Sequence, residues 1–305
     1  MNLDPLSDIF SLNALASVRC TRLEADGSWA LWFPQRERLK FVAILRGAAW
    51  IVIPDRPPLR LEAGDTLLLT NTPFTIASDP AVPAKDGLTL FEASKTNTVR
   101  LAGNKTVMLG GAFVFADDNA RLLIEALPAF MYIPAQQPTA VALSNILSML
   151  DRELEHPGMG SSVMSQRLAD ILLIQALRGY VAQYGQNSAG WIGAFSDARV
   201  GRAIALMHGD VAHRWTVGEL AAAVAMSRSG FALRFKSMVG LAPLEYLRRW
   251  RMQLARRSLR STSCSIGDTA AALGYSSESA FGNAYKREFG QSPTQHSLGA
   301  LNATR

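Results

Sequence analysis

Near its C-terminus the chain repeats one pattern, with the two copies about fifty positions apart. The first copy begins at Thr216 and reads TVGELAAAVAMSRSGFALRFKSMVGLAP, and the second begins at Ser265 and reads SIGDTAAALGYSSESAFGNAYKREFGQSP. The aromatic, lysine, glycine and proline positions Phe231, Phe235, Lys236, Gly240 and Pro243 reappear as Phe281, Tyr285, Lys286, Gly290 and Pro293. The repetition predicts two copies of one structural unit.

Each copy opens with the signal of a short helix. Thr216 precedes Glu219 by three positions, and Ser265 precedes Asp268 by the same spacing. A hydroxyl followed by an acid at this spacing resembles a capping box, although the box prefers Glu or Gln. We therefore expect a helix to begin at each point, and the alanines that follow suit close packing.

A second helix follows a tight turn in each copy. Ser227 can cap it in the first copy, and Ser276 or Ser277 can do so in the second. The aromatic residues are spaced i and i+4, so they share one face and anchor the helix in a core. Gly240 and Gly290 stand where a helix C-terminus favours a left-handed residue.

Two short helices joined by a tight turn are typical of a helix-turn-helix unit, whose second helix enters the DNA major groove. The alternative is an ordinary antiparallel helix pair in a helical core. Duplication and a basic connecting segment favour the DNA-binding interpretation.

That connecting segment begins near Pro243, a favoured first-turn residue, and reads LEYLRRWRMQLARRSL. Arginine recurs along it at Arg248, Arg249, Arg251, Arg256 and Arg257. A helix of some sixteen residues spans roughly 24 Å at ~1.5 Å per residue. This length is compatible with two recognition helices about one DNA turn, ~34 Å, apart.

Charge is segregated along the chain. Residues 197–305 hold 15 Lys or Arg against 7 Asp or Glu, a net of +8, whereas residues 1–196 hold 16 against 18, a net of −2. A basic end on a slightly acidic body is expected of a domain that neutralises phosphates.

The stretch from Asp197 to His296 resembles the DNA-binding domain of the AraC/XylS family of bacterial transcription regulators. The resemblance rests on MSRSGFALRFKSMVGLAPLEYLRRWRM, GYSSESAFGNAYKREFG and the final SP, over about a third of the chain. It implies two helix-turn-helix units that read a long, asymmetric site in double-stranded promoter DNA. It also implies an activator, which would contact RNA polymerase.

The resemblance assigns base contacts to the two recognition helices. These candidates are Arg228, Ser229, Ala232 and Leu233 in the first copy, and Glu278, Ser279, Ala280, Gly282 and Asn283 in the second. Many relatives carry Arg at the places of Leu233 and Asn283. Asn283 can instead pair with adenine, and Leu233 can touch a thymine methyl group or face inward. Arg234 is the candidate for the missing guanidinium.

Phosphate contacts are expected from Lys236 and Lys286, which occupy equivalent positions, and from Arg251 on the connecting helix. Such contacts position a protein on DNA without reading its sequence.

The first 133 residues contain short runs rich in β-branched and aromatic residues, separated by Gly and Pro, which predicts a β-sandwich or barrel. The runs are WALWF from Trp29, KFVAILRG from Lys40, AAWIVI from Ala48, LRLEAGDTLLL from Leu59 and TVMLGGAFVFA from Thr106. LRLEAGDTLLLTNTPFTIAS and the preceding KFVAILRGAAWIVI resemble the strands of a cupin, as found in a branch of the same regulator family. Together the two resemblances span most of the chain, including the opening DPLSDIFSL. The resemblance implies a sensor domain.

This cupin-like region lacks histidine, because the four His residues begin at His156. Val42 and Phe74 stand where cupin relatives carry ligand histidines. A metal site needs several converging ligands, usually including imidazole, so we expect no metal, no cofactor and no catalytic residue.

A pocket for a small-molecule effector is compatible with this composition, because apolar interiors bind ligands through few polar groups. The candidate lining residues are Phe41, Trp50, Phe74 and Phe113. The alternatives are that these side chains only fill the core, and that the barrel is structural or binds a protein.

Between the two regions, apolar residues recur at helical spacing from Leu143 to Leu154 and again from Leu168 to Val181. We expect this helical pair to pack on the barrel and on a second copy of the chain, giving a homodimer. GQNSAGWIGAFSD, from Gly185, is the expected linker.

The sequence thus predicts an α+β protein with three parts. These are a cupin-like sensor domain at 1–135, a helical dimerisation pair and linker at 136–190, and an all-α DNA-binding domain at 197–298. Two cysteines, Cys20 and Cys264, imply no disulfide framework. No apolar run reaches ~18 residues, so we expect no membrane partner and a cytoplasmic location on the bacterial nucleoid. The function expected is transcription regulation; a cupin enzyme is the weaker alternative.

Overall fold

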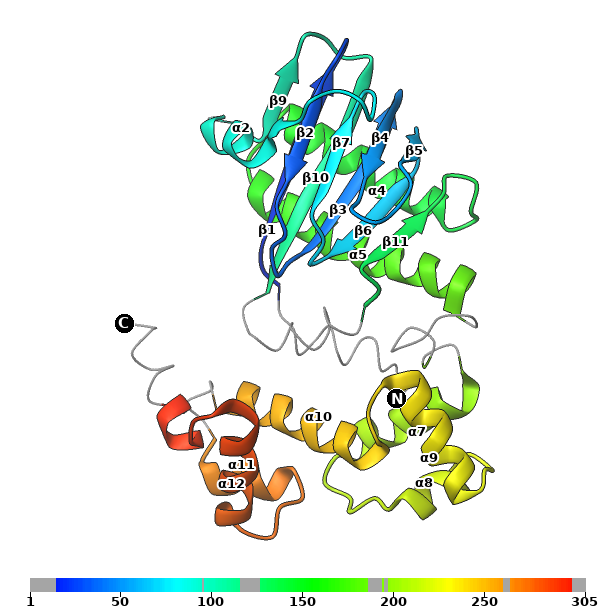
Figure 1. The fold of residues 1–305 in the computed structure, drawn as a ribbon. Helices are drawn as coiled ribbons and strands as arrows, with labels where there is room; N and C mark the ends of the chain where they lie inside the picture. Colours follow the sequence, from blue (N-terminus) through cyan, green and yellow to red (C-terminus); the bar gives the residue numbers. More distant parts are fainter. Residues whose placement is uncertain are drawn as a thin grey trace. The chain divides into compact units, whose positions relative to one another are not determined.

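The computed structural model describes residues 15–94, 96–115, 127–185, 194, 197–259 and 264–297. The chain divides into two compact units, one from Leu15 to Tyr184 and one that begins at Gly185 (Figure 1). The opening segment DPLSDIFSL lies outside the described residues, and so does most of the linker expected after Gly185.

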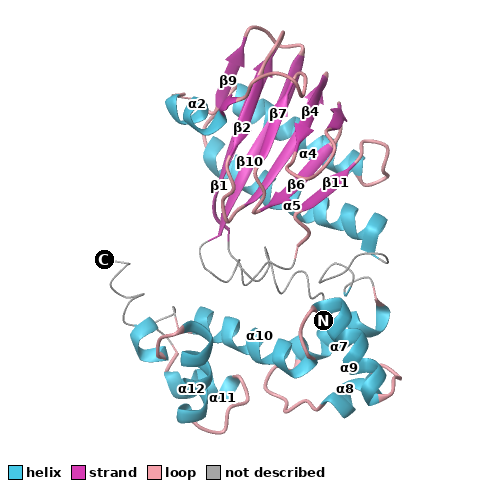
Figure 2. Cartoon of the chain, viewed as in Figure 1, coloured by secondary structure: helices cyan, strands magenta, loops and turns pink. Residues whose placement is uncertain are grey.

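The first unit contains two facing β-sheets (Figure 2). Its strands are β1 (Leu15–Ala25), β2 (Ala30–Phe33), β3 (Leu39–Arg46), β4 (Ala48–Val52), β5 (Leu59–Glu62), β6 (Thr66–Thr70), β7 (Phe74–Ala77), β8 (Lys85–Asp86), β9 (Thr98–Leu101), β10 (Thr106–Phe115) and β11 (Phe130–Ile133). One sheet has the order β11-β6-β3-β10-β1-β9, and the other has the order β5-β4-β7-β2-β8. The predicted all-β region is confirmed, and each apolar run named from the sequence contains at least one strand.

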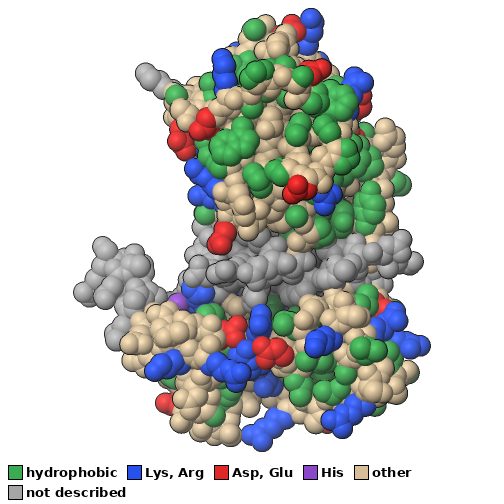
Figure 3. All heavy atoms as spheres, in the orientation of Figure 1, with side chains coloured by type: hydrophobic (Ala, Val, Ile, Leu, Met, Phe, Trp, Pro, Cys, Tyr) green, Lys and Arg blue, Asp and Glu red, His purple; other side chains and the backbone are tan. Residues whose placement is uncertain are grey.

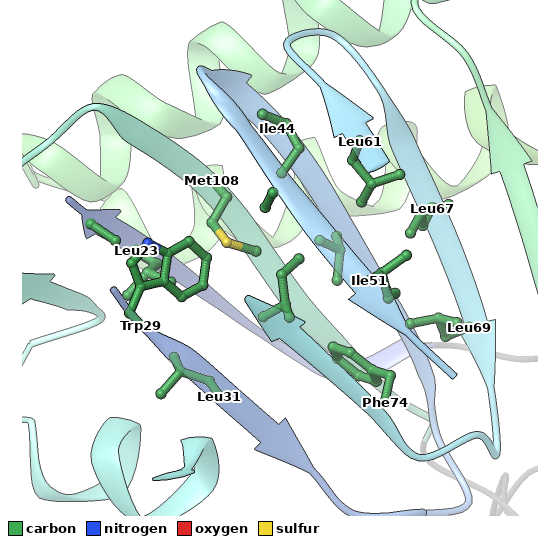
Figure 4. Packing of buried hydrophobic residues seen from close by; sticks show 14 of the residues in the cluster. Leu23, Trp29, Leu31, Ile44, Ile51, Leu61, Leu67, Leu69, Phe74 and Met108 are labelled. Atoms are coloured by element: carbon green, nitrogen blue, oxygen red, sulfur yellow. The ribbon is translucent and has the colours of Figure 1, made fainter. Parts of the chain in front are cut away.

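Alternation along the strands explains the layering. On β3, Val42 and Ile44 point between the sheets, whereas Leu39, Phe41 and Ala43 are buried on the other face. Figure 4 shows side chains from both sheets, including Ile44, Ile51, Phe74 and Met108, meeting in this inter-sheet core. Strand β3 reads as a continuous apolar run because both of its faces are covered.

Two helices cover the outer face of the six-stranded sheet: α4 (Ala140–Glu155) and α5 (Ser161–Tyr184). They are the helical pair expected from the apolar spacing. From the sequence we expected this pair in a range separate from the sensor domain, whereas the sheets and both helices lie in one compact unit, Leu15–Tyr184. Both helices also expose apolar side chains: Val141, Met149, Val163, Met164 and Ile171.

A buried ion-pair network joins β1 to α4. The guanidinium of Arg22 lies 2.7 Å from Asp151 Oδ1, and it also contacts Glu24, which is paired with Arg100. Arg22 is only 5% exposed, so these carboxylates offset the cost of removing its charge from water.

The short helix α2 (Gly87–Ala93) was not expected from the sequence. Asp86 caps it by accepting hydrogen bonds from the N–H groups of Leu88 and Thr89. It packs beside β2 and β9, and Phe91 turns into the inter-sheet core.

The second unit is helical. Its helices are α7 (Ala198–Gly209), α8 (Val217–Ala223), α9 (Arg228–Val239), α10 (Pro243–Ser258), α11 (Ile266–Ala272) and α12 (Glu278–Phe289). The first half of α10 packs in one core with Phe231 and Phe235, and its second half packs in another with Phe281 and Tyr285. The single helix α10 therefore contributes to two similar small cores, as the duplication predicts.

The predicted caps form, with one difference between the copies. Thr216 and Glu219 make the complete capping box, each accepting a backbone N–H. Ser265 accepts from the N–H of Asp268, but the shorter Asp268 side chain accepts from the Ser265 hydroxyl at 2.6 Å. The expectation that the box prefers Glu is thus visible in the structure.

Candidate nucleic-acid interface

The two helix-turn-helix pairs are α8 with α9 and α11 with α12. Ser227 caps α9 and Ser277 caps α12, so Ser277 fills the role for which Ser276 was the alternative. Gly240 and Gly290 end these helices with φ of 81° and 73°. The turn before each recognition helix also contains a left-handed residue, which is Ala225 before α9 and Gly274 before α12.

On α9 the predicted base-contacting residues lie away from the core. Phe231 and Phe235 are fully buried, whereas Arg228 and Ser229 are exposed and Leu233 is 74% exposed. Ala232 is half-buried beside them. Leu233 faces outward, which removes the alternative that it faces the core. A large exposed leucine is compatible with contact to a thymine methyl group.

The equivalent surface of α12 presents different groups. Ser279, Ala280 and Asn283 are exposed, and Gly282 leaves an open position with no atom within 4 Å of where a side chain would begin. The Glu278 carboxylate folds back on α11, where a methyl group at Gly267 would lie 2.5 Å from its Oε1 atom. We call Ser229, Ala232 and Leu233, with Ser279, Gly282 and Asn283, the recognition faces of α9 and α12.

Lys236 and Lys286 follow the recognition faces by one helical turn, and both are exposed. They occupy equivalent places in the two units, as expected for groups that could meet DNA phosphates on either side of the grooves. Figure 3 shows Lys and Arg side chains spread over the visible face of this unit.

Arg234, the other base-contacting candidate on α9, makes a contact within the protein. Its guanidinium pairs with Asp197, with Nε 2.8 Å from Oδ2. Asp197 also caps α7 by accepting from the N–H groups of Arg199 and Val200. Burial acts to raise the pKa of Asp197, but these hydrogen bonds hold it below its usual range. Arg234 thereby links α9 to the start of α7, and its contact with a base stays a prediction.

Arg251 also makes contacts within the protein. Its Nε atom donates to the carbonyl oxygen of Val211 at 2.8 Å, and its Nη2 atom donates to that of His213 at 2.7 Å. The guanidinium lies 6.0 Å from the centre of the Tyr275 ring, and burial lowers its pKa. Arg251 thus holds the loop before α8 beside the turn between α11 and α12. Its contact with phosphate stays a prediction.

Further contacts on α10 were missed from the sequence. Arg248 lies 2.8 Å from Glu288 of α12 and 2.9 Å from Glu245, and Arg249 also pairs with Glu245. Hydrogen bonds from Arg248, with Arg249 assisting, lower the pKa of Glu245 to about 2. The two local pairs have the i, i+3 and i, i+4 spacings that a sequence can signal, whereas Glu288 is forty positions from Arg248 and gave no such signal. Much of the basic character of α10 thus serves the fold.

The β-sheet unit, Leu15–Tyr184, contains a cavity of about 320 Å³ lined by residues of both sheets and of α2. Two of the four predicted pocket residues, Phe41 and Phe74, border it. Phe113 does not line it, because its ring is fully buried against Phe41 with centroids 5.7 Å apart. Trp50 does not line it either, because alternation on β4 places it on the face opposite Ala49 and Ile51.

The cavity also has polar lining that sequence reasoning did not single out. Arg19, Arg36, Arg38, Lys40 and Glu92 are the charged residues of its lining, and we call this partly exposed group the mouth of the cavity. The signal was present in QRERLK, a dense basic run between two apolar strands. Within the described ranges, no three His, Cys, Asp or Glu side chains gather in a way that could hold a metal ion.

Comparison with known proteins covers both units. A cupin family model matches residues 4–182, and a helix-turn-helix domain model matches residues 220–297. A Streptomyces antibioticus protein named as an AraC-like transcription regulator is 39% identical, over 95% of this chain and 97% of its own length. A second, from Streptomyces lividans, is 36% identical over the same shares. The DNA-binding domain of AdpA, solved with a target DNA, is 31% identical over 34% of this chain and 94% of that chain, with a TM-score of 0.32.

Two helix-turn-helix units attached to a cupin domain define a DNA-binding transcription regulator. The chain belongs to the AraC family of these regulators. In the part of the chain that the structure describes, no helix combines the length and apolar character needed to cross a bilayer.

Proposed function

We propose that α9 and α12 read two different DNA half-sites in a fixed order, within one promoter. The observation that carries the proposal is the contrast between repeated scaffold and unrepeated surface. Serine caps, aromatic core positions and C-terminal glycines are equivalent in the two helix-turn-helix pairs, whereas Leu233 of one recognition face corresponds to Asn283 of the other. Two unlike recognition faces, on helices joined through α10, favour an asymmetric target.

Roles within this interface follow from chemistry and exposure. Asn283 offers a bidentate amide suited to adenine, and Arg228 offers a guanidinium suited to guanine. Leu233 supplies apolar contact to thymine. Lys236 and Lys286 bind phosphates and fix the register.

Alanine substitution of the two main base-reading candidates tests these roles. The target is first obtained by selecting tight binders from random double-stranded DNA. Arg228→Ala and Asn283→Ala should each cost ~1–3 kcal/mol of specific affinity and relax preference at different base pairs. Arg257→Ala, an exposed arginine on α10 away from the recognition faces, is the matched control. If both test variants bind the selected site as tightly as the control, the groove assignment is wrong.

We further propose that the first unit regulates this binding as a homodimer that senses a small molecule. The exposed side chains of Val163 and Ile171 on α5 support a contact with a second copy, and the cavity supports a ligand. Ile171→Glu should convert the dimer to a monomer, as measured by sedimentation equilibrium in an analytical ultracentrifuge at micromolar concentration. A monomeric parent protein would contradict the dimer.

Family resemblance supports activation through RNA polymerase in the bacterial cytoplasm, and run-off transcription with purified polymerase tests it. The relatives carry the names of regulators, which supports this reading over a cupin enzyme. A sandwich that is only structural, or that binds a protein, would leave DNA affinity unchanged by any small molecule.

A further inference from the structure

We propose that the sandwich cavity binds an amphipathic monocarboxylate, with its apolar body between the sheets and its carboxylate against the cations of the mouth. The inference rests on the effector-binding role proposed above and specifies the chemical class of the ligand.

The interior of the cavity is apolar. Its walls include Leu31, Phe74 and Ile76 from the five-stranded sheet and Leu23 and Met108 from the facing sheet. Most of these side chains are labelled in Figure 4, where they point into the space between the sheets. Covering such a surface with the hydrocarbon or aromatic body of a ligand removes apolar area from water and favours binding.

Part of the space in the cavity is left open because β10 has a glycine, without a side chain, in the cavity wall. Gly110 lines the cavity, and a side chain beginning there would meet Thr21 Oγ1 at 3.4 Å, which is ordinary contact. A Cβ atom is therefore accommodated at this position, and we expect a longer side chain there to occupy the cavity. At ~30 Å³ per non-hydrogen atom, the share of one molecule in liquid water, 320 Å³ accommodates on the order of ten such atoms.

The mouth carries four cations and one anion, which favours a negatively charged ligand group. Arg19 and Arg36 are exposed, Arg38 is half-buried and Lys40 is 9% exposed. Glu92, on the exposed side of α2, is the one carboxylate in the described lining. A neutral or cationic ligand would leave this imbalance uncompensated.

Lys40 marks where the charged end of the ligand meets the apolar interior. Its Nζ atom donates to the carbonyl oxygen of Pro34 at 3.0 Å and lies 5.2 Å from the centre of the Phe74 ring. An ammonium group has three N–H donors, so two remain for a carboxylate after the bond to Pro34. Burial, together with Arg36 and Arg38, lowers the pKa of Lys40 to about 8, and a bound carboxylate would oppose that shift.

Titration calorimetry on the full chain tests the class with three ligands that share one tail: decanoate, decanol and decylamine. We expect decanoate to bind at least about tenfold more tightly than decanol, since a charged hydrogen bond contributes ~1.5–3 kcal/mol, and decylamine not to bind. Equal affinity for decanoate and decanol, or no binding of decanoate, overturns the proposal.

Three variants locate the binding. Lys40→Met should weaken decanoate about tenfold and leave decanol unchanged, whereas Lys105→Met, a lysine 82% exposed and outside the lining, should change neither. Gly110→Leu should abolish binding of both ligands while circular dichroism and melting stay those of the parent. Decanoate binding that survives both Lys40→Met and Gly110→Leu places the ligand elsewhere and overturns the proposal.

DNA affinity measured with and without decanoate separates the two levels of inference. If decanoate binds by these criteria and DNA affinity does not change, the ligand class stands and the effector role fails. If decanoate does not bind while another metabolite shifts both melting and DNA affinity, the effector role stands and the carboxylate class fails.

Discussion

Replacing Gly274 with alanine perturbs the joint between the two helix-turn-helix units. Gly274 has a φ of +78° in the turn before α12, and a methyl group there would lie 2.1 Å from the carbonyl oxygen of Ala212. Ala212 belongs to the loop that Arg251 holds by its hydrogen bonds to Val211 and His213. The obstacle is backbone, so it cannot be relieved by a side-chain rotation.

The expected cost has two parts. A left-handed conformation costs a residue with a Cβ roughly 1–2 kcal/mol, offset by ~0.4–1 kcal/mol because alanine restricts the unfolded chain. Crowding against a packed neighbour adds about 1–3 kcal/mol. Gly290 has a φ of +73° and no atom within 4 Å of the added methyl group, so Gly290→Ala carries the first part alone. We expect Gly274→Ala to cost about 2–4 kcal/mol and Gly290→Ala about 1 kcal/mol or less.

Hydrogen exchange measured by mass spectrometry resolves the effect locally. In Gly274→Ala, exchange should accelerate in peptides from α11 and α12, while peptides from α4 and α5 in the first unit serve as an internal reference. Specific affinity for DNA with both half-sites should fall more than affinity for either half-site alone. Equal exchange in Gly274→Ala and Gly290→Ala would refute the close packing of this turn on the loop at Ala212.

Three further predictions concern phosphates, the buried lysine and the first turn. Lys236→Ala and Lys286→Ala should each weaken binding to specific and to non-specific DNA by similar factors. In a fluorescence-anisotropy salt titration, each should reduce the slope of log affinity against log salt concentration by about 0.9. An unchanged slope contradicts phosphate contact. The pKa of Lys40 is about 8 in the folded protein and 10.5 ordinarily, so between these pH values the unfolded chain binds more protons than the folded one. The free energy of unfolding should therefore rise with pH across that window, by up to about 3 kcal/mol. Urea unfolding at several pH values should show this rise, and Lys40→Met should remove it. Ala225 has a φ of 52° at the position equivalent to Gly274. Ala225→Gly should therefore stabilise α8 and α9 by up to about 1 kcal/mol and slow their amide hydrogen exchange. Faster exchange in these helices would argue against strain at this turn.

The helical unit was largely predictable because its signals are local. Hydroxyl caps, aromatic pairs at i and i+4 and terminal glycines act within one or two turns of chain, and their duplication made each signal count twice. Arg234 and Arg251 were harder, because the sequence does not reveal that Asp197 and the loop at Val211 fold back to meet them. Long-range ion pairs depend on tertiary packing, which no spacing rule encodes.

The sandwich was predictable as a class and less so in detail. Apolar runs predicted strands such as β3 and β6, yet β9 and β11 were missed, because each has only four residues and β9 also contains Thr and Arg. The pocket assignment failed for Trp50 and Phe113 for a geometric reason. Aromatic identity does not tell on which face of a strand a side chain lies, and a shift of one residue in register reverses that face.

The central claim is that one chain reads two unlike half-sites in a fixed order and phase. The most direct measurement compares affinity for the selected DNA with affinity for the same DNA after its second half-site is inverted or moved by about 5 base pairs, half a helical turn. We expect either change to weaken binding about as much as scrambling that half-site, on the order of 100-fold where several contacts of ~1–3 kcal/mol are lost. Affinity that stays within about twofold of the parent site, when scrambling itself costs 100-fold, would contradict the claim.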